Sequence, residues 1–156
     1  MTRRISTTLT AAVLALGLTP VVQGTAQAAE VVIGVLYPLT GPVAQVGIDA
    51  VAAVKTAVDI INEDVNLNVP LGPGKGLTNL GGAKIRLVIA DHGGKPDVGQ
   101  AEAERMITQE KVHALFGAYY SSVTKTASQV AERYQIPYLN AESTSPGLSK
   151  RGFKWF

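Results

Sequence analysis

The sequence predicts an α/β fold in which a parallel sheet carries helices on both faces. Short runs of β-branched and apolar residues recur along the chain. Between them lie longer stretches whose apolar residues follow the helical period. Strands that alternate with helices are joined by right-handed crossovers, which make neighbouring strands parallel and place helices on both faces of the sheet.

The first strand and helix are predicted by a change of period. Residues 31–37 are a continuous apolar run that stops at Pro38, which is typical of a strand buried on both faces. A turn-rich loop follows over residues 38–47. Residues 48–63 then show a helical stripe. Its apolar members are Val51, Val54, Val58 and Ile61, widened by Ala50, Ala53 and Ala57.

The middle of the chain repeats this alternation after an irregular segment. Glycines and prolines crowd residues 64–82 and predict a long loop. Residues 84–90 are the second expected strand and residues 98–110 the second helix. Residues 113–118 are the third expected strand.

The last third adds one more helix and strand. Ser121 and Ser122 are expected to cap a helix that runs to about residue 134. A short fourth strand is expected over residues 136–140, followed by a polar loop. Residues 152–156 look like the opening of another strand, so we expect the chain to be part of a longer protein.

The first 28 residues have the three parts of a secretory signal. Arg3 and Arg4 are followed by an apolar centre at residues 11–18 and by Ala26-Gln27-Ala28. The apolar centre is too short for a membrane anchor, which needs about 20 residues. We expect residues 1–28 to be a cleaved signal peptide and the mature chain, from near Ala29, to lie in the periplasm.

Composition and charge exclude several classes of protein. The chain is 46% hydrophobic and 17% charged, unlike a disordered tail or a coiled coil. Arg3 and Arg4 account for its formal charge of +2, so the rest is neutral, which argues against a nucleic-acid partner. Without cysteine there is no disulfide, thiolate zinc site or cysteine nucleophile.

Motifs for catalysis and cofactors are missing from the sequence. The chain lacks the P-loop pattern, the dinucleotide fingerprint after the first strand, and the nucleophile elbow of hydrolases. His92 and His113 do not have metal-ligand spacing, and we expect a loop and a sheet position for them. Asp91 at a strand end leaves a phospho-acceptor as a minor alternative. We expect a non-enzymatic protein without cofactor, metal or catalytic residue.

Polar and aromatic residues gather after the predicted strands. Ligands of such folds bind outside the carboxyl ends of the strands. Ser121 and Ser122 stand at a helix N-terminus, where free N–H groups suit a carboxylate, although plain capping is the alternative. Tyr119 and Tyr120 form an aromatic wall or pack on a partner lobe. Further hydroxyls are offered by the segment Ser143-Thr144-Ser145. The alternative interpretation of this segment is an ordinary turn without a role in binding.

At this point the chain resembles a known family. The resemblance lies in residues 34–47, Ile61-Asn62, residues 116–122, residues 141–148 and Arg151-Gly152. These segments are similar to type I periplasmic solute-binding proteins of ABC transporters, and most of all to receptors for branched-chain amino acids. Members have two lobes, so the resemblance implies that residues 29–156 are an N-terminal lobe, incomplete at its C-terminal end.

The family implies a function and a set of contacts. A small-molecule ligand is captured between the lobes and delivered to ABC permease subunits in the membrane. The ligand carboxylate is held at positions that match Ser121 and Thr144. An aromatic residue of the family is replaced here by Val46, and a small residue whose carbonyl meets the ligand ammonium is replaced by Glu142.

These departures leave the ligand open. Beside an amino acid, the sequence allows an amide, a urea-like compound or an aromatic acid. Two other functions stay open as well: an extracellular sensor that feeds a signalling partner, and a secreted α/β enzyme.

Overall fold

The sheet has four parallel strands in the order β2-β1-β3-β4. The computed structural model describes residues 29–63, 65 and 75–156, so the predicted signal peptide and most of the loop over residues 64–82 lie outside the described residues. The strands are β1 Glu30–Tyr37, β2 Lys84–Asp91, β3 Ala114–Gly117 and β4 Tyr138–Leu139.

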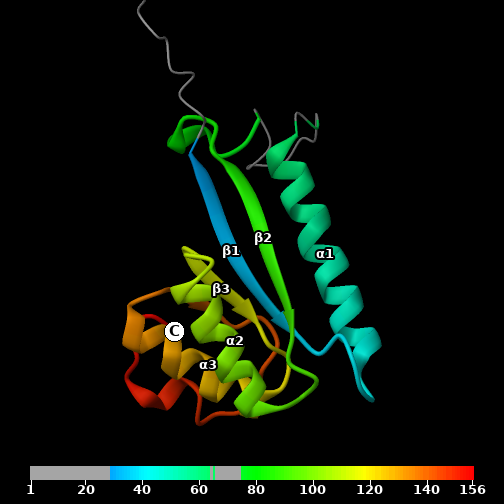
Figure 1. Cartoon of the computed structure of the whole chain (residues 1–156), viewed down its shortest axis with the longest axis vertical. Helices are drawn as coiled ribbons and strands as arrows, with labels where there is room; N and C mark the ends of the chain where they lie inside the picture. The colour runs from blue at the N-terminus through cyan, green and yellow to red at the C-terminus, as the bar shows by residue number, and fades with distance from the viewer. Residues whose placement is uncertain (1–28, 64, 66–74) are drawn as a thin grey trace, which may run out of the picture.

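Three helices connect the strands and lie on both faces of the sheet. They are α1 Ala44–Asn62, α2 Pro96–Thr108 and α3 Ser121–Tyr134, with short 3₁₀ turns at η1 Thr78–Leu80 and η2 Ser149–Arg151. Figure 1 shows α2 and α3 packed together, while α1 runs apart from them alongside β1 and β2. The predicted fold class is confirmed.

The alternation of side chains along β1 divides the core in two. Val32 and Leu36 pack with α2 and α3, whereas Val35 and Tyr37 pack on the face that α1 covers. Gly34 belongs to the first set, because a Cβ there would lie 2.6 Å from Leu115 Cδ2. The long apolar run was therefore correctly interpreted as a strand buried on both faces.

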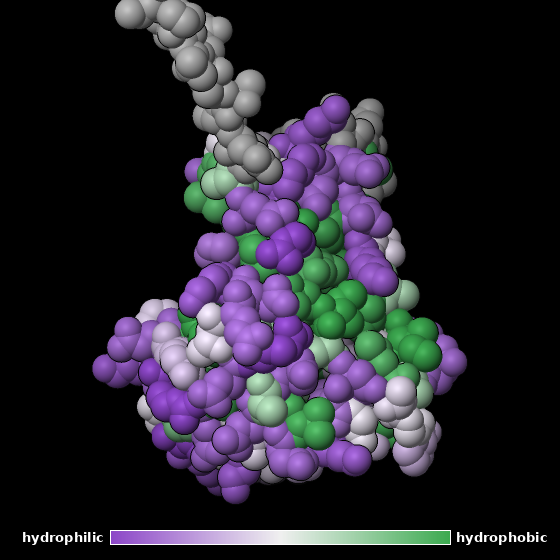
Figure 2. Space-filling view, in the orientation of Figure 1, coloured by the Kyte–Doolittle hydropathy of each residue, from purple (hydrophilic) through white to green (hydrophobic). Residues whose placement is uncertain are grey.

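The face of the sheet under α1 is only partly covered. Of the apolar stripe predicted for this helix, Val51 is buried, whereas Val54, Val58 and Ile61 are half-buried. Figure 2 shows a hydrophobic band in this region. The half-buried sheet residues that pack here are Ile33, Leu87, Ile89 and Phe116.

Several predicted boundaries are wrong. The helix α1 begins at Ala44 rather than at residue 48, and β4 covers only Tyr138–Leu139. The residues 152–156 form no strand, although the Tyr138 N–H donates to the Trp155 carbonyl at 2.7 Å. Their backbone therefore lies beside β4 without continuing the regular ladder.

Candidate functional site

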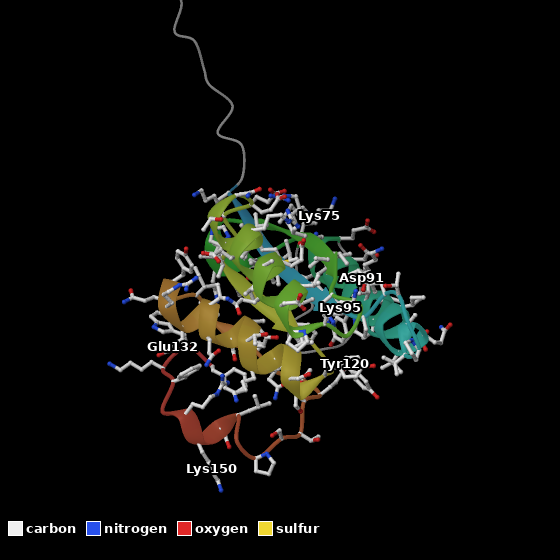
Figure 3. All side chains as sticks on the ribbon, turned by 60° about the horizontal axis from the view of Figure 1, so that its bottom comes forward. Lys75, Asp91, Lys95, Tyr120, Glu132 and Lys150 are labelled. Carbon is white, nitrogen blue, oxygen red and sulfur yellow. The ribbon has the colours of Figure 1, made fainter. Side chains whose placement is uncertain are left out.

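The loops after the four strands meet at the carboxyl edge of the sheet. Figure 3 brings this part of the molecule forward, with Asp91, Lys95 and Tyr120 near one another. Asp91, the last residue of β2, fixes the loop after β1. Its carboxylate accepts hydrogen bonds from the Leu39 N–H at 2.7 Å and the Thr40 hydroxyl at 2.5 Å, and from the Gly93 N–H at 2.8 Å.

These bonds decide the charge of Asp91. Burial by itself would raise the pKa of this carboxyl, but the hydrogen bonds from Thr40, Gly93 and Leu39 outweigh it and lower the pKa. The side chain is thus an ionised anchor for two loops. This structural role explains why an aspartate ends β2, so the phospho-acceptor alternative is not needed to account for it.

His92 is buried beneath the same edge. Its Nε2 lies 2.9 Å from the Ala118 carbonyl, and its Nδ1 accepts a hydrogen bond from the Gly94 N–H at 3.0 Å. One neutral tautomer, with the proton on Nε2, satisfies both contacts. Desolvation lowers the pKa of His92. The residue lies in the predicted loop but is enclosed, and it ties the ends of β2 and β3 together.

The two tyrosines after β3 have their rings in edge-to-face contact, with the ring centres 5.4 Å apart, and each ring packs against a different half of the core. Gly117 has φ +131°, and a Cβ there would lie 2.1 Å from the Leu36 carbonyl oxygen. Tyr119, with φ +71°, packs toward the α1 face. Tyr120 packs toward α2 and α3, with its ring at 6.2 Å from that of His92. Both are half-buried, so each presents only part of its ring at the edge.

The N-terminus of α3 carries two of the predicted ligand residues. The helix begins at Ser121, and no side chain caps it, so the prediction that a serine is the N-cap is wrong. The N-cap position belongs to Tyr120, because the chain leaves its extended conformation only after that residue. Ser121 Oγ instead accepts a hydrogen bond from the Ser145 N–H at 3.2 Å, and Ser122 is exposed. The Val123 N–H already donates to the Tyr120 carbonyl at 3.0 Å, whereas the N–H groups of Ser121 and Ser122 have no hydrogen bond to a described residue and remain available to an anion.

The loop after β4 buries one predicted hydroxyl and exposes another. Ser143 Oγ donates to the Tyr119 carbonyl at 3.0 Å and lies 2.6 Å from Thr124 Oγ1. The Asn140 side chain closes the loop through the Ser143 N–H and carbonyl, both at 2.9 Å. Ser143 is therefore an internal support of the loop. Thr144, the next residue, is exposed, and its hydroxyl has no hydrogen bond to another described residue.

Two more predicted residues lie at the edge. Glu142 is exposed, and its Oε1 accepts a hydrogen bond from the hydroxyl of Tyr37 at 3.2 Å. Burial raises the pKa of Tyr37, and the charge of Glu142 raises it further, so the phenol stays protonated and donates. Val46 is 38% exposed in the first turn of α1.

A cavity beside the N-terminus of α3 is lined by serine hydroxyls and by two cationic side chains. It has a volume of 340 Å³ and is lined by Ser121, Ser122, Ser145, Lys125 and Arg151, among others. Hydroxyl donors and positive side chains favour an anionic group there. Among the residues that the structure describes, no cluster of three or more histidines and acids could hold a metal ion.

Sequence reasoning missed the residues that hold the edge together. Tyr37 and Thr124 were not singled out as site residues, Arg151 was named only as part of the family resemblance, and Asp91 was considered only for another role. One signal was available for Tyr37: a phenol at the end of a fully buried strand needs a hydrogen-bond partner. For the others the partners are distant in sequence, so the chain alone gave no indication.

The geometry defines a class of protein: a parallel α/β domain whose hydroxyl-bearing loops and helix N-terminus converge at the carboxyl edge, as in ligand-binding folds. Residues 30–156 match the family described as periplasmic binding protein. The chain belongs to that family. Within the described segments no helix is long and apolar enough to cross a membrane.

Curated relatives carry the names of amino-acid binders. The chain is 32% identical over 133 residues to the Leu/Ile/Val-binding protein homolog 8 of Brucella abortus (strain 2308), covering 84% of this chain and 29% of that protein. It is also 32% identical over 144 residues to homolog 7 of Brucella suis biovar 1, covering 90% and 32%. The chain thus spans about a third of the length of these relatives.

Solved structures agree in fold. The branched-chain amino acid transporter substrate binding protein LivJ from Streptococcus pneumoniae, in complex with isoleucine, is 24% identical and superposes with a TM-score of 0.67 over 81% of this chain and 32% of that one. A solute binding protein of an ABC transporter from Rhodopseudomonas palustris BisB5, in complex with 3,4-dihydroxybenzoic acid, is 20% identical with a TM-score of 0.63, covering 78% and 30%. At these identities the likeness concerns the fold alone.

Proposed function

We propose that the protein is the extracytoplasmic solute-binding receptor of an ABC importer. It captures a small amino acid or a related polar ligand and delivers it to a membrane permease. Residues 29–156 are one lobe of this receptor, and the segment 1–28 directs its export. The names of the relatives support an amino acid as ligand, while the dihydroxybenzoate in a structural neighbour keeps an aromatic acid among the candidates.

One observation carries the proposal. The Ser145 N–H donates to Ser121 Oγ, which brings the loop with Thr144 against the N-terminus of α3. The cavity at this place is lined by Ser121, Ser122 and Lys125, beside a helix N-terminus that no side chain caps, and this lining suits a carboxylate. Among the described residues no hydrogen bond joins the hydroxyl of Ser121 or Ser122 to a side chain that could act as a general base, which favours binding without turnover.

The test removes one hydroxyl from this position. The full-length protein is titrated by calorimetry with leucine, valine, urea, short amides and an aromatic acid. For the ligand that binds, Ser121→Ala is expected to weaken affinity by about 10- to 100-fold, since a hydrogen bond to a charged group contributes about 1.5–3 kcal/mol. Ser149→Ala, an exposed serine in η2, is the matched control and should leave affinity unchanged.

Two results would contradict the proposal. A change of less than about twofold in a folded Ser121→Ala protein would remove this residue from the site, since one such hydrogen bond is worth more. Conversion of the bound ligand into a product during the titration would favour the enzyme alternative.

A further inference from the structure

Three hydroxyl side chains of α3 contact the segment that follows β4. Their spacings of three and four residues place them on one face of the helix: Ser121, Thr124 and Ser128. Their partners are, in the same order, the Ser145 N–H at 3.2 Å, the Ser143 hydroxyl at 2.6 Å and the Arg151 guanidinium at 2.9 Å. Figure 3 shows this segment, coloured toward red, beside α3. The segment is thus attached to the helix at three points.

The cavity at the N-terminus of α3 lies between these two elements. The helix contributes Ser121 to its lining and the segment contributes Ser145, each with further neighbours. The hydrogen bond between these two residues closes one side of the cavity. The position of the segment relative to α3 therefore determines the shape of the proposed carboxylate site.

The contact between Thr124 and Ser143 is buried on both sides. Thr124 is 0% exposed and Ser143 is 8% exposed. Ser143 has a single hydroxyl proton and donates it to the Tyr119 carbonyl at 3.0 Å, so Thr124 is the donor across the 2.6 Å contact. Thr124 Oγ1 in turn accepts a hydrogen bond from the Ala118 N–H at 3.3 Å. One hydroxyl thus connects α3, the turn after β3 and the loop after β4 in a buried chain of hydrogen bonds.

The bond from Ser145 decides how Ser121 can act. Because Ser121 Oγ accepts the Ser145 N–H, its own proton is directed away from that group. Among the described residues Ser121 Oγ donates no hydrogen bond, so its proton is available to an acceptor in the cavity. Ser145 stands two residues after Ser143. The contact between Thr124 and Ser143 therefore holds the backbone that orients the Ser121 hydroxyl.

We propose that Thr124 is a positioning residue: through Ser143 it fixes the loop whose Ser145 N–H orients Ser121 as a donor to the ligand carboxylate. The proposal rests on the proposed solute-binding function and adds a residue that does not itself line the cavity. Without the Thr124 hydroxyl, Ser143 loses its donor and the loop loses its buried attachment to α3. Ser121 then no longer has a fixed N–H to orient its proton.

Substitutions at two threonines of α3 test this role. The full-length protein is titrated by calorimetry with whichever of leucine, valine, urea, the short amides and the aromatic acid binds. Thr124→Val keeps the shape of the side chain without its hydroxyl and should weaken affinity by about tenfold, the lower end for a hydrogen bond to a charged group. Thr124→Ser keeps the hydroxyl and should restore most of the affinity.

Thr126→Val is the matched control. It makes the same change on the same helix, but the Thr126 hydroxyl donates to the Pro96 carbonyl at 2.8 Å, at the start of α2. Its removal should lower the melting temperature, because a half-buried acceptor loses its donor, and should leave affinity unchanged. Loss of stability by itself is thereby separated from loss of positioning.

A double-mutant cycle gives a readout that a merely structural role would not move. In the Ser121→Ala protein no hydroxyl remains to be oriented, so the further change Thr124→Val should weaken affinity by less than about twofold. Independent effects would instead multiply. Ser143→Ala in place of Thr124→Val should give the same pattern, and it decides the question if the Thr124→Val protein does not fold.

The outcomes separate the two proposals. If Ser121→Ala weakens binding but Thr124→Val does not, this inference is overturned and solute binding stands. Equal losses of affinity in Thr124→Val and Thr126→Val, or effects that multiply in the cycle, overturn it in the same way. If Ser121→Ala leaves affinity unchanged or no compound of the panel binds, the proposed site fails, and this inference fails with it.

Discussion

At the scale of single residues, His92 is the group whose protonation the fold resists. Both ring nitrogens are used by a neutral ring, one toward the Ala118 carbonyl and one toward the Gly94 N–H. A second proton on Nδ1 would displace the Gly94 bond and place a charge in the interior. Desolvation accordingly holds the pKa of His92 below its usual value.

This lowered pKa predicts that the protein loses stability in mild acid. The unfolded chain takes up the His92 proton near pH 6.5, before the folded protein does. The free energy of unfolding should therefore fall as the pH drops below about 6.5, and level off below the pKa of the folded state. Urea unfolding across this pH range measures the slope.

Two substitutions assign that slope. His92→Gln keeps a donor for the Ala118 carbonyl but does not titrate, so it should flatten the dependence in this range. His113→Gln, at the exposed histidine that accepts a bond from the Val32 N–H, leaves His92 in place and should keep the slope. An unchanged slope in His92→Gln would show that other groups cause it.

Residue types were easier to predict than their orientation. The sequence correctly placed Ser121 and Thr144 after neighbouring strands, because strand ends in a parallel sheet meet at one edge. It did not distinguish Thr144 from Ser143, whose hydroxyl is turned inward to Thr124 and Tyr119. That difference depends on partners 19 and 24 residues away, which no local pattern reveals.

At the scale of elements, Arg151 joins three segments around α3. Its guanidinium donates to the Leu148 carbonyl at 2.9 Å, to the Lys125 carbonyl at 3.1 Å and to Ser128 Oγ at 2.9 Å. It also stacks on the rings of Phe153 and Phe156, with its Cζ 4.2 and 4.7 Å from their centres. The planar fork of an arginine is suited to serving several acceptors at once.

We therefore expect Arg151→Lys to destabilise the fold by about 1–3 kcal/mol, since its acceptors, two of them partly buried, lose their donors while the charge is kept. Thermal melting measures the loss. Lys150→Ala, at an exposed neighbour, should have little effect. If Arg151→Lys melts at the same temperature as the unchanged protein, the contacts of the guanidinium contribute no stability and the prediction fails.

Elements with a clear period were predicted best. The range 121–134 for α3 agrees with the structure, because a stripe of buried residues follows the helical repeat as far as Ala131 in the last turn. The start of α1 was missed, because Pro42 and the glycines around it indicate a loop although the helix begins directly afterwards at Ala44. For β4, the apolar run is longer than the two residues that pair with β3.

At the scale of the whole molecule, the two faces of the sheet are unequally covered. On one face α2 and α3 bury a continuous core. On the other face, α1 is the only helix among the described residues, and it leaves four sheet residues half-buried: Ile33, Leu87, Ile89 and Phe116. Leu139 of β4, which pairs with Phe116 of β3, is 52% exposed. The relatives are about three times as long as the matched segment, so we propose that later parts of a complete receptor cover this face.

The last prediction concerns residues 29–156 produced alone. Apolar surface that is exposed over several neighbouring residues favours association, because association removes it from water. Light scattering should show an apparent mass that rises with protein concentration. Leu139→Thr should shift the equilibrium toward the monomer, since it removes apolar surface from an exposed position and leaves no cavity in the core. Leu80→Thr, at a leucine that is 58% exposed in η1, is the matched control and should leave association unchanged. If the segment stays monomeric at every concentration, or if both variants reduce association equally, the half-covered face of the sheet is not the surface responsible.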